Sequence, residues 1–191
     1  PFSFQRPRAG VWYGGTGDMT LGFKRVVAGS RRSGSLVSLI GEASFPTGNK
    51  ARDLGTGATI FEGFAAYAQL LPKNAFLQFQ GGVELPARTR DVSRAAFWRS
   101  TVGGSFARDQ GFGRTWSPML EVLADRELVA GEKTNWDIVP QLQVTLNKRQ
   151  HIRANLGVRL PVNNSLGRRS MAVVFYVLWD FFDGGLLDGW K

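Results

Sequence analysis

Apolar and polar residues alternate between Thr134 and Val162, and this alternation predicts a long antiparallel hairpin. The apolar positions of the first arm, separated mostly by polar residues, are Trp136, Ile138, Pro140, Leu142, Val144 and Leu146. After a polar turn at 148–150 the apolar positions resume as Ile152, Ala154, Leu156, Val158 and Leu160. Because successive side chains of a strand point to opposite faces, each arm has one apolar face and one wet face.

The length of the two arms indicates strands that cross a membrane. Each arm runs for about 12 to 14 residues, whereas strands of globular proteins commonly have about 5 to 6. At about 3.3 Å per residue, such a strand tilted by about 45° spans a hydrocarbon core of roughly 30 Å. The sequence has no apolar run near the roughly 18 residues that a transmembrane helix needs, so we predict no such helix.

Seven further segments alternate in the same way and bring the number of predicted strands to nine. These segments are 18–28, 36–45, 57–71, 75–85, 95–107, 116–125 and 170–182. The predicted strands are joined alternately by short turns and by longer loops. The turns lie near 29–34, 72–74, 109–113 and 148–150, and the loops near 46–56, 86–94, 126–133 and 163–169.

This order of connections is typical of outer-membrane barrels, which have tight periplasmic turns and longer external loops. The last strand then ends in the periplasm. Closure with both termini there needs an even strand count, so we expect a tenth strand from residues 2 to 13; a twelve-stranded parent with further N-terminal strands is the alternative. The predicted fold is all-β, an antiparallel up-and-down transmembrane β-barrel over residues 1–182, followed by a periplasmic C-terminal tail, 183–191.

A soluble β-sandwich or soluble barrel also shows alternating strands and is the competing interpretation. The strand length and the glutamine, glutamate and arginine on the wet faces favour a barrel with a polar lumen. Tryptophans near predicted strand ends favour it as well, because aromatic girdles mark both membrane interfaces. These tryptophans are Trp12, Trp98, Trp116, Trp136 and Trp179.

The chain contains no cysteine, which excludes disulfides, thiolate metal sites, cysteine catalysis and haem attachment through a Cys-x-x-Cys-His motif. The only histidine, His151, follows the basic turn at Lys148 and Arg149, with no serine or carboxylate local to it. A hydrolase of the serine type would need a base oriented by a third group beside a nucleophile. We therefore predict no enzymatic activity, no catalytic residues, no cofactor and no metal site.

The net charge is +9, which raises the question of a polyanionic partner. The basic residues are spread over turns and loops instead of forming one basic helix or an aromatic-basic RNA motif. Contact with anionic outer-membrane lipid and lipopolysaccharide therefore explains them better than nucleic acid does. No signal peptide is visible and the chain begins at Pro1, so we interpret it as a processed or truncated form.

Two motifs carry a family resemblance. Gly17-Asp18-Met19-Thr20-Leu21-Gly22-Phe23-Lys24 resembles a "G-D-x-x-L-G-x-K" strand opening, and Phe45-Pro46-Thr47-Gly48 with Leu54-Gly55-Thr56-Gly57 resembles a "P-T-G … L-G-T-G" loop. Both are similar to segments of the outer-membrane transporter-like barrels associated with phenol and aromatic meta-pathway degradation. The aromatic strand Val173 to Phe182 resembles the C-terminal signal recognised by the barrel-assembly machinery. The resemblance implies a Gram-negative envelope protein with a transport role.

Charged residues on the predicted wet faces are the candidate lumen-lining set. They are Lys24, Glu42, Glu84, Arg99, Glu121, Asp125, Asp137, Arg153 and Arg159. Rows of charge in a pore can set ion selectivity. The simpler interpretation is that paired charges and glutamines fill a narrow lumen, since buried charges must be paired.

The tail carries three apolar residues, Leu186, Leu187 and Trp190, on a glycine-rich background. A frayed terminus is the plain interpretation. The alternative is a docking peptide for a periplasmic protein partner, with these residues as its anchors.

Two functional hypotheses follow, from different classes. The first is a passive outer-membrane channel or transporter for small solutes, aromatic or hydrophobic ones among them. The second is a non-transporting barrel that anchors or scaffolds a multi-protein envelope complex, such as an electron-carrier assembly. A third and weaker one is a soluble β-barrel that binds a lipid or pigment. The fold by itself does not choose between them.

Overall fold

The computed structural model describes residues 2–5, 13–52, 54–90, 92–109, 112–146, 152–163 and 171–179. Its strands are β1 (Phe2–Gln5), β2 (Tyr13–Thr16), β3 (Met19–Ser30), β4 (Ser35–Phe45), β5 (Ile60–Leu70), β6 (Ala75–Pro86), β7 (Ala95–Gly104), β8 (Phe106–Asp109), β9 (Phe112–Glu127), β10 (Asn135–Thr145), β11 (Ile152–Asn163) and β12 (Ala172–Trp179). Two short 3-10 helices, η1 (Lys50–Arg52) and η2 (Pro72–Asn74), lie in connections. Neither helix of this part of the chain is long and apolar enough to cross a membrane.

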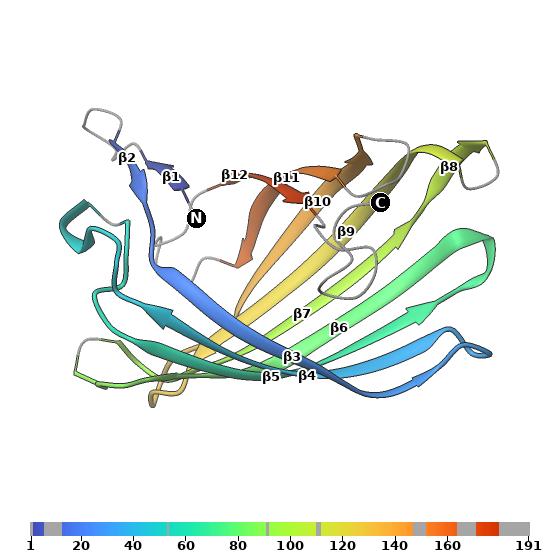
Figure 1. The fold of residues 1–191 in the computed structure, drawn as a ribbon. Coiled ribbons are helices and arrows are strands. Elements are labelled where there is room, and N and C mark those ends of the chain that lie inside the picture. Colours follow the sequence, from blue (N-terminus) through green and yellow to red (C-terminus); the bar gives the residue numbers. More distant parts are fainter. Residues whose placement is uncertain are drawn as a thin grey trace, which may run out of the picture.

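The long strands form one antiparallel meander in the order β12-β11-β10-β9-β7-β6-β5-β4-β3, with the short β8 paired to β9. Figure 1 shows this sheet curled into a trough, with β3 and β12 as its two edges. The predicted all-β, antiparallel up-and-down arrangement is confirmed, and each of the nine predicted strands corresponds to a strand of this sheet.

The sheet is not closed, because β3 and β12 do not pair with each other in the described part of the chain. A tenth strand was predicted between residues 2 and 13, and of this stretch the structure describes residues 2–5 and 13. The strand found there, β1, does not join the long sheet. β1 instead pairs with β2 in a separate two-stranded sheet. Both strands have only four residues, and Gly17 and Asp18 interrupt the chain between β2 and β3.

The tight connections lie together at one end of the sheet, which we call the turn end; it holds residues 31–34 and 71–74. The turn at 31–34 closes through Gly34, whose φ is 68° and where an added Cβ would lie 2.8 Å from the Leu70 Cβ. In the turn at 71–74, Lys73 and Asn74 adopt φ values of 60° and 59°. The opposite loop end holds the longer connections 46–59, 87–94 and 128–134.

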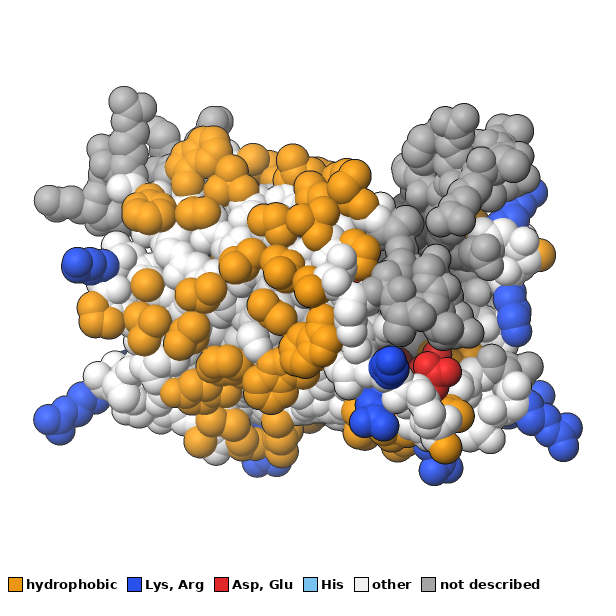
Figure 2. Space-filling view, turned by 180° about the vertical axis from the view of Figure 1, so that it is seen from behind, with side chains coloured by type: hydrophobic (Ala, Val, Ile, Leu, Met, Phe, Trp, Pro, Cys, Tyr) orange, Lys and Arg blue, Asp and Glu red, His pale blue; other side chains and the backbone are white. Residues whose placement is uncertain are grey.

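Register sorts the side chains onto two faces, because residues directly opposite each other in antiparallel strands point the same way. Met19, Leu21 and Phe23 lie on the convex face, and Phe23 is 71% exposed. Figure 2 shows apolar side chains spread over this convex surface, with Lys and Arg near its borders. Charged and amide side chains of the long strands, such as Glu84, Arg99 and Gln141, lie on the concave face, so the usual arrangement of a soluble domain is inverted.

Two boundaries differ from the sequence prediction. The strand expected at 95–107 is divided at Ser105 into β7 and β8, and both pair with β9. β9 is consequently longer than the predicted segment 116–125, because its first residues pair with β8 beyond the end of β7. Alternation cannot reveal such a bend, since both halves keep the same pattern.

Candidate functional site: a polar cavity on the concave face

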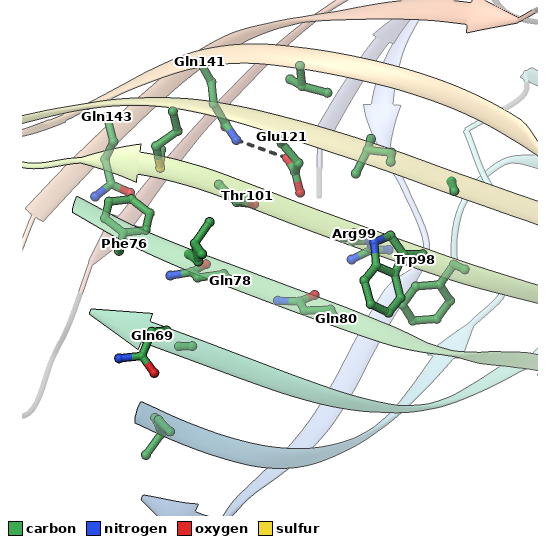
Figure 3. A pocket seen from close by; sticks show the side chains of 18 of the residues that line it. Gln69, Phe76, Gln78, Gln80, Trp98, Arg99, Thr101, Glu121, Gln141 and Gln143 are labelled. Atoms are coloured by element: carbon green, nitrogen blue, oxygen red, sulfur yellow. Dashed lines mark hydrogen bonds between the residues drawn. The ribbon is translucent and has the colours of Figure 1, made fainter. Parts of the chain in front are cut away.

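A cavity of about 1440 Å³ occupies the concave face, lined by residues from β3 to β12. Figure 3 shows side chains from neighbouring strands converging on it, among them Gln78, Thr101, Glu121 and Gln141. They reach the same space because every second residue of each strand points inward and the register aligns these residues from strand to strand.

Amides and hydroxyls line the half of the cavity nearer the turn end, together with Arg31 and Arg153. Gln78 lies opposite Thr101, which in turn lies opposite Glu121. Gln141 Nε2 donates a hydrogen bond of 3.1 Å to Glu121 Oε2, and Figure 3 shows this contact across the wall. Gln143 lies opposite Ser117 on the neighbouring strand. Such groups can replace water around an uncharged or polar solute without imposing a fixed charge.

Carboxylates gather in the half nearer the loop end. Glu42, Glu62 and Glu84 occupy directly opposite positions on β4, β5 and β6. Like charges opposite each other in a sheet repel and are destabilising. Arg99 on β7 interacts electrostatically with Glu62, Glu84 and Glu121, so one guanidinium offsets part of this repulsion.

An aromatic contact supports Arg99. Its guanidinium carbon lies 4.8 Å from the centroid of the Phe97 ring, within the range of a cation–π interaction. Phe97 is buried and meets Phe64 edge-to-face, with ring centroids 5.6 Å apart. The wall near the loop end is therefore mixed, with aromatic rings beside charged groups.

Arg159 and Asp137 form an ion pair on the concave face. Arg159 Nε donates to Asp137 Oδ2 over 2.6 Å, and Arg159 Nη2 approaches the same oxygen. Asp137 is only 1% exposed, so its charge depends on this partner.

The sequence-predicted lumen residues are distributed as follows. Six of them line the cavity: Glu84, Arg99, Glu121, Asp125, Arg153 and Arg159. The other three lie on the same face by register or contact: Lys24 opposite Ile40, Glu42 opposite Gly22, and Asp137 bonded to Arg159. The proposed docking residues Leu186, Leu187 and Trp190 lie outside the described residues, as do His151 and Trp12.

The sequence analysis expected glutamines in the lumen without naming individual positions, and it missed Glu62, which lies where the alternation is weak. Its charge-based selection also passed over Asn155, which lies between Gln143 and Tyr176 in the register. Asn155 is 1% exposed, and neither polar atom of its amide has a hydrogen-bond partner in the described structure. Only tertiary packing distinguishes such an amide from a solvated one.

A second polar arrangement, the Asp18 clasp, joins the two motifs that carry the family resemblance. We use this name for Asp18 with Gly48 and Thr56. The Asp18 carboxylate accepts hydrogen bonds from Gly48 N at 2.9 Å, Thr56 N at 2.7 Å and Thr56 Oγ1 at 2.8 Å. Partial burial alone would raise the pKa of Asp18, but these hydrogen bonds lower it below its ordinary value.

The glycines of the loop are needed for this close approach. A Cβ on Gly48 would lie 2.4 Å from the Leu54 carbonyl oxygen, and one on Gly55 would lie 2.5 Å from Asp18 Oδ1. The clasp fixes loop 46–59 against the start of β3, at the loop end of the sheet.

Tryptophans mark two levels of the convex face. Trp98 and Trp136 both lie directly opposite Ala124, toward the loop end. Trp116 lies opposite Phe106 near the turn end, and Trp179 is the last residue of β12. Neighbouring rings extend the first level, since Phe79 lies 5.9 Å from Trp98 by ring centroids.

Comparison of the chain with protein-family models, curated proteins and solved structures found no match.

Proposed function

We propose that this chain forms a transmembrane β-barrel of a Gram-negative outer membrane and acts as a passive channel for small solutes, aromatic or hydrophobic ones among them. The observation that carries the proposal is the inverted distribution of side chains on one curved sheet. Apolar residues cover the convex face, and amides and charges line a cavity on the concave face.

The convex face supports a lipid environment. Leu21, Leu156, Val173 and Phe175 are each more than half exposed there. Contiguous apolar patches larger than a few hundred Å² are rare on monomeric soluble proteins. In a membrane such a surface is favourable, because it contacts hydrocarbon in place of water.

The spacing of the tryptophans fits a bilayer. Eight residues of β9 separate the level of Trp116 from that of Ala124, which Trp98 and Trp136 flank (124 − 116). At about 3.3 Å per residue and a tilt of about 40°, the two levels are about 20 Å apart along the membrane normal. Apolar bands of outer-membrane barrels are about 25 Å tall and have an aromatic girdle at each border.

Barrel closure is part of the proposal. Nine antiparallel strands in sequence leave β3 and β12 running in the same direction. An all-antiparallel barrel therefore needs an odd number of additional strands, and totals of ten or twelve meet this condition. In hydrocarbon the open edges would leave backbone N–H and C=O groups without partners, which costs several kcal/mol per group.

The cavity supports solute passage. Its wall combines the neutral amides Gln78, Gln80 and Gln143 with the ring of Phe76 and the side chain of Met119. This mixture contacts both polar and apolar parts of a small molecule. The family resemblance, on the Asp18 clasp motifs, adds aromatic compounds to the expected solutes.

Single-channel recording in a planar bilayer tests the proposal. The purified protein should show steady conductance steps, and a heat-modifiable band on a denaturing gel should confirm in parallel that the barrel is folded. A cavity variant, Gln141→Trp, should reduce the step size, while the convex-face control Leu142→Trp should leave it unchanged. A folded barrel that stays silent would contradict the channel and favour the scaffold hypothesis.

A further inference from the structure

Within the described part of the chain, no strand pairs with the side of the 12-residue edge strand β3 that faces away from β4. Every residue of β3 is exposed. On the assumption that the proposed membrane barrel is correct, this edge must be covered by another strand. The geometry around β1 and β2 indicates where that strand comes from.

β2 leads into β3 with only Gly17 and Asp18 between them. β1 pairs antiparallel with β2, with Phe2 opposite Thr16 and Gln5 opposite Tyr13. In this register, a residue further toward the N-terminus lies opposite a residue further along the chain toward β3. Polypeptide that precedes β1 would thus run beside β3 in the antiparallel direction.

The position of β1 agrees with this path. Leu54 of loop 46–59 approaches Gly15 of β2, so this loop packs against β2 near the side of the sheet where β4 lies. Figure 1 draws β1 on the other side of β2, toward β12. The open edge of β3 is on that same side, because β4 occupies the opposite one.

We infer that β1 and β2 are the tip of a longer hairpin, and that the strand covering β3 is the polypeptide leading into β1. This strand is antiparallel to β3 and also to β12, since those two edges run in the same direction. Closure of the barrel requires an odd number of additional strands. This strand supplies that number either alone or as the last of three.

The alternation of side chains along β3 predicts the composition of the strand that covers it. Residues directly opposite each other share a face, so those opposite Met19, Leu21 and Phe23 should be apolar and meet lipid. Those opposite Thr20, Gly22 and Lys24 should be small or polar and face the lumen. A strand of about a dozen residues covers β3 at the usual rise.

Hydrogen exchange of β3 amides tests the inference. Two proteins are compared in detergent micelles, residues 1–191 and the same chain extended by the residues that precede Pro1 in its gene. In the first, every second amide of 19–30 should exchange freely, because those amides point to the open edge. In the extended chain these amides should be protected at least about 100-fold.

A matched variant identifies the register. Replacing the residue opposite Leu21 in the extended strand by proline should restore rapid exchange in β3, because proline disrupts an edge ladder. The same substitution on β4, Leu39→Pro, serves as the control for general unfolding. Peptides of β9 and β10 should stay protected from exchange in the variant with proline in the extended strand, but not in Leu39→Pro.

Two results would overturn the inference: equal protection of β3 in both proteins, or no coding sequence for such a strand before Pro1. Conductance measured on the same samples distinguishes a failure of this strand placement from a failure of the proposed channel function. A conducting extended chain with unprotected β3 would refute the strand placement alone. A silent chain with protected β3 would refute the channel alone.

Discussion

Arg159 and Asp137 form a hydrogen-bonded ion pair across β10 and β11, with Nε and Oδ2 separated by 2.6 Å. The two ends of the pair differ in environment, because Asp137 is 1% exposed and Arg159 is 36% exposed. The carboxylate is thus the group that depends on the partner. The guanidinium can return to water if the pair is broken.

We expect Arg159→Gln to destabilise the protein by about 1 to 3 kcal/mol, because it removes a cation that is hydrogen-bonded to a buried carboxylate. This is less than the cost of breaking a fully buried pair, since Arg159 is partly exposed. Urea unfolding in detergent, followed by the heat-modifiable band, measures the change. The double variant Arg159→Gln with Asp137→Asn should recover much of the loss. Equal destabilisation in the single and double variants would contradict the assigned role of the pair.

The Asp18 clasp should make stability depend on pH. The hydrogen bonds from Gly48 and Thr56 lower the pKa of Asp18 in the folded protein below its ordinary value. Its contribution is therefore present above the unfolded pKa of about 3.9 and is lost as pH falls through the lower folded pKa. Asp18→Asn should reduce the unfolding free energy at neutral pH by about 1 kcal/mol, the scale of one hydrogen bond.

The measurement for this prediction is the unfolding midpoint between neutral and strongly acidic pH. The difference between the native protein and Asp18→Asn should shrink as pH falls through the folded pKa. Glu132→Gln, at a carboxylate in the loop 128–134, away from the clasp, is the control. A difference that does not change with pH would mean that Asp18 acts by packing alone.

Close backbone contact in loop 46–59 should make Gly48 intolerant of a side chain. Gly48→Ala would place a Cβ 2.4 Å from the Leu54 carbonyl oxygen, which forces the loop off the clasp. We expect a loss of about 1 to 3 kcal/mol, the usual cost of overpacking. Gly63→Ala is the matched control, since nothing lies within 4 Å of its Cβ. Proteolysis of the loop should increase only in the first variant.

The row of Glu42, Glu62 and Glu84 should favour cations over anions if the protein is a channel. The central residue, Glu62, has a carboxylate on each neighbouring strand. Glu62→Gln should lower the cation-to-anion permeability ratio by about two- to threefold, because it removes one of three adjacent charges. The reversal potential in a salt gradient measures this ratio. Glu132→Gln, on a loop at 128–134, should leave the potential unchanged.

Individual residues show how far the sequence could be interpreted. The arms of the β10–β11 hairpin were predictable because strand alternation has a period of two and both arms keep it over a dozen positions. The strand division at Ser105 was not, because a bend does not disturb the alternation of Trp98, Val102 and Phe106. Charged residues could be assigned to a wet face, but Glu62 was overlooked where the pattern around Phe61 is weak.

The candidate site was only partly contained in the sequence. Alternation placed Glu84 and Glu121 on one face, yet it could not show that Glu42, Glu62 and Glu84 occupy opposite positions. That depends on the register of two strand pairs. β4 and β5 are joined by the loop 46–59, and β5 and β6 by the turn 71–74. The clasp between Asp18 and Thr56 joins positions 38 residues apart in sequence. Its motifs were recognisable, but their contact was not.

The sequence by itself determined the class of structure, the order of the nine long strands and, where the alternation is regular, the face that a side chain takes. These follow from local sterics and from the period of the pleat, which act within a few residues. Only the tertiary structure decided that, among the described residues, β3 and β12 do not pair with each other, that β1 pairs with β2, and that Asp137 is buried against Arg159. Such outcomes depend on long-range pairing, whose free energy is a sum over many strands that no short segment encodes.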